Sequence, residues 1–270
     1  MPDIERILQN TPGTIKQQWY EDGAAVDPGT VTLGITRADG TVLIAAGAAT
    51  AGTGTNPRTF NLSAGNTALL DTLKVTWTSS LKGTLVSYLE VVGGFLFTIA
   101  QAQALAAGAT TAQIADARIY AETELEHALG YALVPRYKLT TTYVNTWDGP
   151  RVMPFLRTIR SAINGTTTLT ADDIALLVPN RGGLAGYRWS NERTVIGYEH
   201  GLDAPPPGAS QAALSVALGQ LGADQSGSID PRATSIVTVD GTVNLRAAFG
   251  QFSAVGVNEW VAANRLPCIA

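Results

Sequence analysis

Residues 31–41 (VTLGITRADGT) decide how the first third of the chain is interpreted. Apolar residues alternate with small or polar ones over the first six positions, which is the pattern of a half-buried strand. Asp39-Gly40 then supplies the positive φ angles of a two-residue hairpin turn, and a second β-prone run follows at residues 41–45. The stretch therefore predicts an antiparallel hairpin.

The same β character extends outward from this hairpin, from residue 14 to about residue 92. The predicted strands are residues 14–20, 31–37, 41–45, 58–62, 73–78 and 84–92, with turn signals such as Lys82-Gly83 between them. Short strands at this spacing predict a small antiparallel β-sandwich of immunoglobulin-like type. The single cysteine, Cys268, allows no internal disulfide. The Cys…Trp…Cys hallmark of immunoglobulin domains is therefore absent, and Trp77 is expected only as a core residue.

At Gly93-Gly94 the hydrophobic period changes from 2 to about 3.6, which favours helix. The pattern predicts one helix over residues 95–108 and another over residues 110–130, the second with a Thr-x-x-Gln capping box at its start. The acidic residues expected outside the apolar stripe of the second helix are Glu122, Glu124 and Glu126. Two helices joined this closely form an antiparallel hairpin.

Beyond Pro135, β character returns and alternates with two further helices. The predicted strands are residues 138–145, 158–163, 166–169, 194–199, 236–239 and 242–246, and the predicted helices are residues 209–222 and 257–264. Asp172-Asp173 is expected as a short polar link. The predicted fold class is α+β, with an immunoglobulin-like sandwich domain at residues 1–92 and a mixed helical and β-hairpin domain at residues 93–270.

The composition disfavours several classes of function. Charged residues make up 15% of the chain against a typical ~25%, and the net charge is −4, so a protein that wraps nucleic acid is disfavoured. Residues 91–115 carry no charge, but Gly, Gln and Thr interrupt them too often for a membrane span. The first residues lack the basic start and apolar run of a signal peptide. No membrane partner is expected.

The inventory of catalytic residues is thin. His127 is expected at the surface, and His200 has no second ligand spaced for a metal ion. The sequence contains neither a nucleophile elbow nor a phosphate-binding loop. We therefore predict no catalytic residue, metal site or cofactor, and we do not expect an enzyme.

From residue 93 onward the chain resembles the head-to-tail connector, or adaptor, proteins of long-tailed double-stranded DNA bacteriophages. The resemblance rests on the order of short segments over roughly residues 93–267: the helical pair at 95–129, RTIRSAING at 157–165, VIGYEHGLDAPP at 195–206, PRAT at 231–234, the Asp240-Gly241 hairpin and VNEW at 257–260. The segment EVVGGFLF at 90–97 is similar to the junction in actinobacterial-phage versions, in which an immunoglobulin-like domain precedes the adaptor.

The resemblance implies a structural virion protein that is assembled in the host cytoplasm and located in the neck. Copies would form a ring, dodecameric in this family, between the portal protein and the stopper or tail-completion proteins. DNA would pass through the channel without sequence-specific recognition. The family works without metal or cofactor.

Two sets of residues are candidates for contacts in such a ring. The candidate subunit interface comprises Arg157, Arg160, Glu122, Glu124 and Glu126, because residues 136–200 hold eight basic residues, seven of them arginines suited to bidentate pairing. The candidate portal contact comprises Trp260, Asn264, Arg265 and Pro267. Solvated or internally paired arginines are the other interpretation of the basic block. The competing function is an extracellular or tail-associated carbohydrate-binding or adhesion protein.

Overall fold

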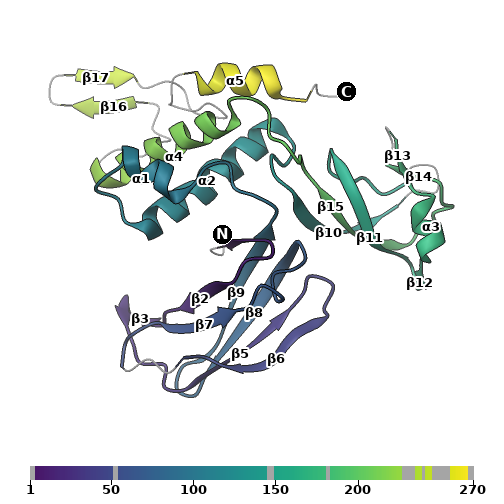
Figure 1. The fold of residues 1–270 in the computed structure, drawn as a ribbon, viewed down its shortest axis with the longest axis horizontal. Coiled ribbons are helices and arrows are strands. Elements are labelled where there is room, and N and C mark those ends of the chain that lie inside the picture. Colours follow the sequence, from purple (N-terminus) through teal and green to yellow (C-terminus); the bar gives the residue numbers. More distant parts are fainter. Residues whose placement is uncertain are drawn as a thin grey trace. The chain divides into compact units, whose positions relative to one another are not determined.

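The structure is a computed structural model that describes residues 4–50, 54–144, 149–180, 183–226, 235–238, 241–244 and 256–266. Its fold is α+β, with several separate sheets and more strand than helix (Figure 1). The chain divides into two compact units that alternate along the sequence: Met1–Gly94 with Pro135–Gly201, and Phe95–Val134 with Leu202–Ala270. The expected boundary at residues 92 and 93 lies near the first change of unit, whereas residues 135–201 group with the N-terminal part.

A five-stranded sheet dominates the N-terminal part of the first unit. It has the order β1-β9-β8-β5-β6, with β1 (Ile4–Leu8), β5 (Val31–Thr36), β6 (Val42–Ala48), β8 (Asp71–Ser79) and β9 (Gly83–Val92). β1 pairs in parallel with β9, and the other neighbours are antiparallel. Sequence patterns do not predict β1, because charged residues interrupt it and its register places Arg6 opposite Glu90, far along the chain.

A two-stranded sheet of β2 (Gly13–Gln17) and β7 (Arg58–Leu62) packs against the five-stranded sheet through a shared apolar core. Buried residues of that core include Ile15, Leu33, Ile35, Leu62, Leu73, Val75, Leu89 and Val91. The rings of Trp19 and Trp77 meet edge to face with centroids 6.5 Å apart, so the prediction that Trp77 is a core residue is confirmed. The hairpin between β5 and β6 is confirmed, and Gly40 has a φ of 89°. The predicted two-residue turn is wrong, because Asp39 has no positive φ and the Arg37 N–H donates to the Thr41 carbonyl oxygen at 2.8 Å across a three-residue loop.

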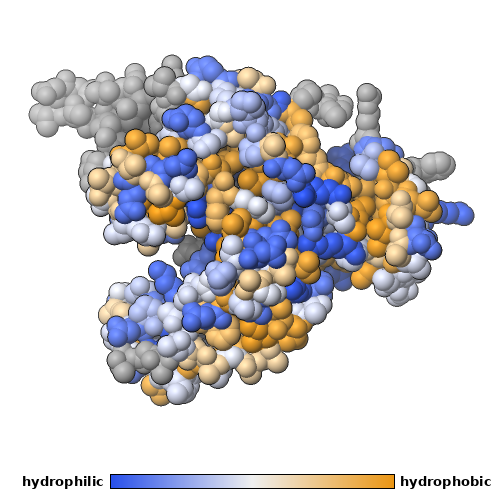
Figure 2. Space-filling model, viewed as in Figure 1, coloured by the Kyte–Doolittle hydropathy of each residue, from blue (hydrophilic) through white to orange (hydrophobic). Residues whose placement is uncertain are grey.

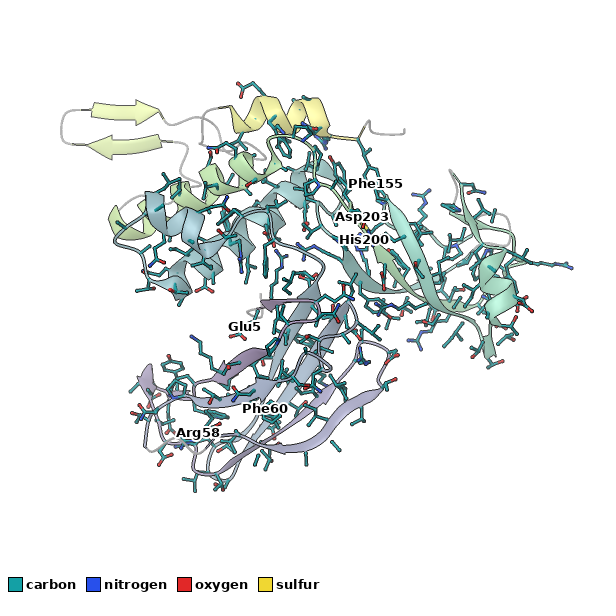
Figure 3. All side chains as sticks on the ribbon, viewed as in Figure 1. Glu5, Arg58, Phe60, Phe155, His200 and Asp203 are labelled. Carbon is teal, nitrogen blue, oxygen red and sulfur yellow. The ribbon has the colours of Figure 1, made fainter. Side chains whose placement is uncertain are left out.

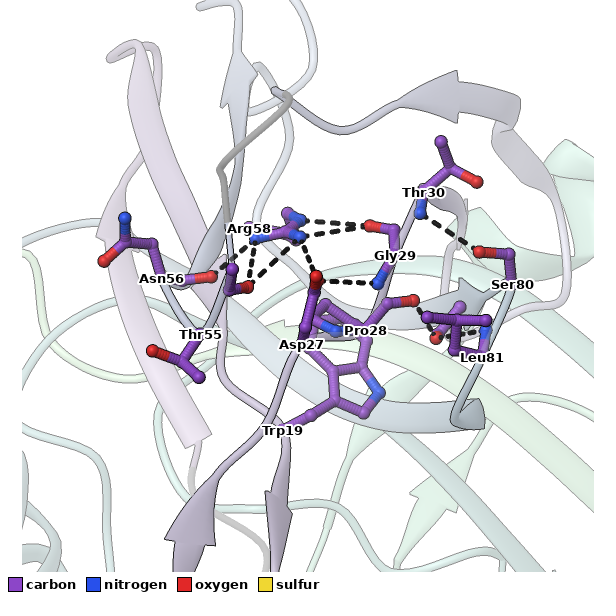
Figure 4. Close-up of polar contacts among 12 residues, drawn as sticks. Trp19, Asp27, Pro28, Gly29, Thr30, Thr55, Asn56, Arg58, Ser80 and Leu81 are labelled. Carbon is purple, nitrogen blue, oxygen red and sulfur yellow. Dashed lines mark hydrogen bonds and ion pairs between the residues drawn. The ribbon is translucent and has the colours of Figure 1, made fainter.

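Arg58, the first residue of β7, holds the neighbouring loops in place (Figure 4). Its side chain is only 3% exposed, and it pairs with Asp27 at 2.8 Å. The same guanidinium donates hydrogen bonds to the carbonyl oxygens of Gly29, Gly54 and Asn56. A buried guanidinium is tolerated only when its donors are satisfied in this way. The hairpin of β3 (Tyr20–Glu21) and β4 (Ala24–Ala25) comes shortly before Asp27 in the sequence.

The rest of the first unit is built on an antiparallel sheet of order β10-β15-β11-β12, comprising β10 (Arg136–Tyr143), β11 (Leu156–Asn164), β12 (Thr167–Thr168) and β15 (Arg193–His200). A small region with α3 (Ala171–Ala175), β13 (Val178–Pro179) and β14 (Leu184–Ala185) packs on its core. The expected polar link at Asp172-Asp173 is wrong: these residues open α3. The cause is a capping box between Thr170 and Asp173, which nucleates a helical turn.

The second unit contains four helices and one hairpin among its described residues: α1 (Ile99–Leu105), α2 (Thr111–Leu129), α4 (Ala209–Ser226), α5 (Val257–Asn264), β16 (Ser235–Thr238) and β17 (Gly241–Asn244). The α2 start is confirmed, since Thr110 and Gln113 form the capping box, and Gly130 ends the helix in the left-handed conformation. α1 begins at Ile99 and not at the expected residue 95, because Thr98 and Gln101 form a capping box there.

The four helices enclose an apolar core rich in alanine, including Ala102, Ala117, Ala121, Ala213 and Ala217. Small side chains allow helix backbones to approach closely. None of the helices in the described ranges has both the length and the apolar character that crossing a bilayer demands.

Candidate functional site

Buried charges gather where the end of β9 meets the start of β10. The Glu90 carboxylate accepts hydrogen bonds from Arg6 Nε at 2.8 Å and from Arg136 Nη1 at 2.7 Å. The exposed fractions of these side chains are 16%, 7% and 6% respectively. Burial raises the pKa of Glu90, but attraction to Arg136 and Arg6 and their hydrogen bonds outweigh it and hold the pKa below 4.5. The charged carboxylate therefore ties the five-stranded sheet to β10.

His200, the last residue of β15, stands opposite Arg136 in the strand register. It is 5% exposed, and its Nδ1 has no hydrogen-bond partner. Burial lowers the pKa of His200 to about 4; Lys138 and Arg136 lower it further, and Glu90 opposes them. Phe155, labelled with His200 in Figure 3, comes directly before β11, and its carbonyl oxygen accepts a hydrogen bond at 3.0 Å from the N–H of Gly201, the residue after His200. At neutral pH this imidazole is an uncharged part of the protein interior.

Arg160 on β11 joins the same two sheets at a second point. Its Nε donates to Glu199 Oε1 at 2.7 Å, its Nη2 donates to the same oxygen, and its Nη1 donates to the Leu70 carbonyl oxygen at 2.6 Å. The guanidinium lies 4.9 Å from the ring centre of Tyr137. Burial, with nearby acidic residues of which Asp71 is foremost, raises the pKa of Tyr137 to about 12, although Arg160 opposes the shift.

The two arginines of the candidate subunit interface both stand at irregularities of β11. The register between β11 and β15 shifts once at Arg157 and again at Arg160. A β-bulge adds a residue to one strand and redirects its side chain. Arg160 is thereby satisfied within its own chain, as the second interpretation of the basic block anticipates, whereas Arg157 is exposed. Sequence periodicity cannot reveal a bulge, because an irregular strand breaks the period on which it relies.

The three glutamates of α2 occupy different environments. Glu122 is fully buried, and its Oε1 accepts a hydrogen bond from the Leu96 backbone N–H at 2.8 Å. Glu126 is half-buried and accepts one from the Leu133 N–H at 3.0 Å. Glu124 is half-buried. The expectation that Glu122 lies outside the apolar stripe is therefore wrong, because it satisfies a backbone donor inside the unit, and it has no surface to offer a second subunit.

Three of the candidate portal residues lie on α5 or directly after it. Trp260 is half-buried, and its Nε1 donates to the Pro207 carbonyl oxygen at 2.8 Å. Asn264 is also half-buried, with its carbonyl oxygen accepting from the Tyr131 hydroxyl at 3.0 Å. Arg265 follows the helix and is exposed. Pro267 lies outside the described residues.

No cluster of three His, Cys, Asp or Glu side chains in the described ranges could hold a metal ion. His127 is exposed on α2, as the sequence predicts. Hydrogen bonds from Thr170 lower the pKa of Asp173, so this carboxylate works as a helix cap.

An open hollow of about 450 Å³ lies beside the β3–β4 hairpin. It is lined by Gln17, Gln18, Trp19, Tyr20, Glu21, Val26, Lys82 and Leu85. Tyr20 is 69% exposed, and Glu21 pairs with Lys82 at 2.6 Å. Elsewhere on the first unit, Figure 2 shows apolar surface over α3 and β13, where Leu176 and Val178 are exposed.

Comparison with known proteins adds little to this description. No protein-family model and no curated protein matches the sequence. One similar solved structure is the ZIG-8–RIG-5 heterodimer of first immunoglobulin domains. The match covers 34% of this chain and 82% of that chain, at 17% identity and a TM-score of 0.21. A likeness at this TM-score carries no argument.

Proposed function

We propose that the chain is a structural protein of the neck of a long-tailed double-stranded DNA bacteriophage. Copies form a ring between the portal protein and the stopper or tail-completion protein, and the ring extends the DNA channel without reading base sequence. The support is the ordered set of short segments over residues 93–267 that resembles head-to-tail adaptors.

The observation that carries the proposal is that the buried ionisable groups bind other parts of the same chain. Glu90, Arg136 and Arg160 bind opposite charges or backbone carbonyls and so join two sheets of one unit. Glu122 satisfies a backbone N–H, and His200 is neutral at pH 7. These groups hold the chain's own segments in position, which suits a protein that works through a fixed shape.

We also propose the finer domain identities. Five strands ordered β1-β9-β8-β5-β6, with the β2–β7 pair packed on their apolar face, favour an immunoglobulin-like sandwich for residues 1–92. Residues 93–270 would then form the adaptor domain, with its helical hairpin, β-hairpins and alanine-rich helix α4.

Of the residues that the sequence suggests for subunit contacts, exposure now favours two. Arg157 is exposed and Glu124 is half-buried, whereas Glu122 is enclosed and Arg160 is held by Glu199. We keep Arg157 and Glu124 as candidate subunit contacts. Trp260, half-buried on α5, and Arg265, exposed directly after the helix, stay candidate portal contacts.

Immunogold labelling of virions with an antibody against the purified chain tests the function directly. We expect gold at the vertex where capsid meets tail, and a ring in negative-stain images of the chain mixed with the portal protein of the same phage. Gold along the tail shaft, at the tail tip or over the capsid faces would refute the neck assignment.

The hollow beside Tyr20 favours carbohydrate binding as a second candidate function. An exposed phenol next to amide and carboxylate side chains is the chemistry that stacks on and hydrogen-bonds to a sugar. A glycan array probed with the full chain and with Tyr20→Ala tests it. Binding that Tyr20→Ala removes would support an adhesion role, and a blank array would exclude it for the glycans displayed.

A further inference from the structure

Phe155 has a backbone conformation that favours glycine. Its φ is 57°, and among the described residues no other aromatic residue has a positive φ. Asparagine and aspartate tolerate this left-handed conformation, whereas a bulky side chain is strained by it. Strained residues persist only where neighbouring structure holds them in place, and they cluster at functional sites. The strain at Phe155 therefore indicates a function for its side chain.

Two hydrogen bonds fix the backbone around Phe155. Its carbonyl oxygen accepts from the Gly201 N–H at 3.0 Å, and the Met153 N–H donates to the Tyr198 hydroxyl at 3.0 Å. Tyr198 is 1% exposed and belongs to the apolar core of the sheet that contains β11 and β15. The Phe155 side chain is nevertheless 43% exposed. An exposed phenyl group on a fixed backbone loses little conformational entropy when a partner covers it.

Exposed arginines stand on both sides of Phe155 in the sequence. Arg151 and Arg157 are exposed, and no acidic residue occurs from residue 149 to residue 171. Aromatic and arginine side chains are enriched at the centres of protein interfaces, where a few residues carry most of the binding energy. We call residues 151–157 the anchor segment. A surface that complements it combines an apolar contact with acidic side chains.

The outer face of α2 combines these two kinds of residue. Positions i, i+3, i+7 and i+10 of a helix lie on one face, and on α2 one such set is Asp116, Ile119, Thr123 and Glu126. Asp116 and Thr123 are exposed, whereas the other two are half-buried. Ile119 is not part of the apolar core that the described helices share. It is therefore an apolar contact point between two carboxylates.

The spacing of the charges on the two surfaces is compatible with a direct contact. Asp116 and Glu126 are ten residues apart, which corresponds to about 15 Å along a helix. Arg151 and Arg157 are six residues apart, so their backbones are separated by at most about 20 Å. The long arginine side chains extend beyond the backbone on either side of the phenyl group. When that group lies on Ile119, each arginine can reach one carboxylate.

We propose that the anchor segment of one copy docks on the outer face of α2 in a second copy. The phenyl group of Phe155 packs on Ile119, and the two arginines pair with the two carboxylates. The inference rests on the proposed self-assembly and names the surfaces that carry it out. Because the two surfaces differ, the contact is head-to-tail and can repeat around a ring.

Photo-cross-linking of the full chain tests which surface Phe155 contacts. The variant Phe155→p-benzoylphenylalanine is mixed with an excess of isotope-labelled wild type, alone at high protein concentration and in parallel with the portal protein of the same phage. After irradiation, we expect mass spectrometry to find cross-links to the labelled peptide of residues 111–129. The same substitution at Leu176, which is 63% exposed in the same unit, is the matched control and should not cross-link to α2.

Three outcomes would overturn the proposal. Cross-links to unlabelled α2 alone would mean that the anchor segment contacts the helix of its own chain. Cross-links only to other labelled peptides or to the portal protein would mean that a different surface receives it. No cross-link in either sample would mean that no protein surface covers Phe155.

Substitutions give a second measurement. Phe155→Gly removes the phenyl group and relieves the strain, and it should weaken self-association at least about tenfold by sedimentation. Asp116→Arg should also weaken it, and either Arg151→Glu or Arg157→Glu in the same chain should restore it, because the exchanged charges attract again. Wild-type association of Phe155→Gly, or restoration by neither arginine variant, would reject the contact.

The result is separable from the test of the neck assignment. Gold at the vertex without a cross-link to labelled α2 rejects the docking contact alone. A cross-link to labelled α2 with gold elsewhere on the virion rejects the neck assignment alone.

Discussion

Replacing Glu90 by Gln tests whether one carboxylate ties two sheets together. The change keeps the shape of the side chain and removes the charge that Arg6 and Arg136 contact at 2.8 and 2.7 Å. Both guanidinium groups stay less than one-tenth exposed, so water replaces little of the lost attraction. Loss of one partner from a buried ion pair costs roughly 3–5 kcal/mol. We expect Glu90→Gln to lower the free energy of unfolding by about 3 kcal/mol.

Thermal and denaturant unfolding at pH 7 measure this loss. For a unit of roughly 150–250 residues, 1 kcal/mol moves Tm by about 2–4 °C, so the midpoint of the first unit should fall by about 6–12 °C. Glu21→Gln is the matched control, because Glu21 pairs with Lys82 but is 60% exposed. A surface pair of this kind contributes about 0–1 kcal/mol. Equal midpoints for the two variants would refute the role given to Glu90.

The pH dependence separates charge from packing. The folded pKa of Glu90 lies below its ordinary value of 4.5, so its stabilisation is complete above that pH and is lost as the pH falls toward the folded pKa. The stability difference between wild type and Glu90→Gln should therefore narrow below about pH 4.5. A difference that stays constant down to acid pH would show that the lost stability comes from packing.

Four further comparisons probe other parts of the fold. Thr110→Ala should lower helix stability by about 1 kcal/mol in thermal circular dichroism, with Thr110→Ser close to wild type. Gly149→Ala should cost about 3 kcal/mol in denaturant unfolding, because its Cβ would stand 1.8 Å from the Leu184 carbonyl oxygen, whereas Gly222→Ala meets nothing within 4 Å. Because burial lowers the pKa of His200 to about 4, wild type should lose stability as the pH falls from about 6.5 to 4, and His200→Gln should flatten that slope. Arg160→Glu should lower Tm, because Arg160 joins Glu199 and the Leu70 carbonyl oxygen, whereas Arg157→Glu, at an exposed position, should lower the yield of rings.

The features that the sequence predicts well have a short-range cause. The turn between β5 and β6 depends on the positive φ of Gly40, and the start of α2 depends on Thr110 and a residue three positions later. A short-range cause also sets where α1 and α3 begin. Thr98 with Gln101, and Thr170 with Asp173, are capping boxes that the hydrophobic pattern alone overlooks.

The features that the sequence does not predict depend on residues far apart in the chain. A helical pattern places Glu122 beside the apolar stripe, but only the fold brings the Leu96 N–H to its carboxylate. Exposed Arg157 and half-buried Arg160 both stand at bulges of β11, whose positions follow from the pairing with β15. Candidate contact residues chosen by charge alone therefore include groups already used within the chain.

The path of the chain at Gly93 bears on the role of the N-terminal sheet. The Gly93 N–H donates to the Pro135 carbonyl oxygen at 2.8 Å, and a Cβ at Gly93 would stand 2.6 Å from the Pro135 ring, so only glycine allows this approach. The helical segment 95–134 thus leaves and re-enters the first unit at one point, as an inserted domain does.

The β10 sheet and the N-terminal sheet are separate sheets of one unit, and three contacts join them: Glu90 with Arg136, Arg160 with the Leu70 carbonyl oxygen, and Gly93 with Pro135. A module that only decorates a particle needs no such fastening and would be joined through a linker that few contacts cross. Ionic and backbone contacts at one junction therefore favour an N-terminal sheet that holds the β10 sheet in a fixed position. If the N-terminal sheet braces the ring, Glu90→Gln should lower ring yield along with Tm, whereas a decorating domain would leave ring yield unchanged.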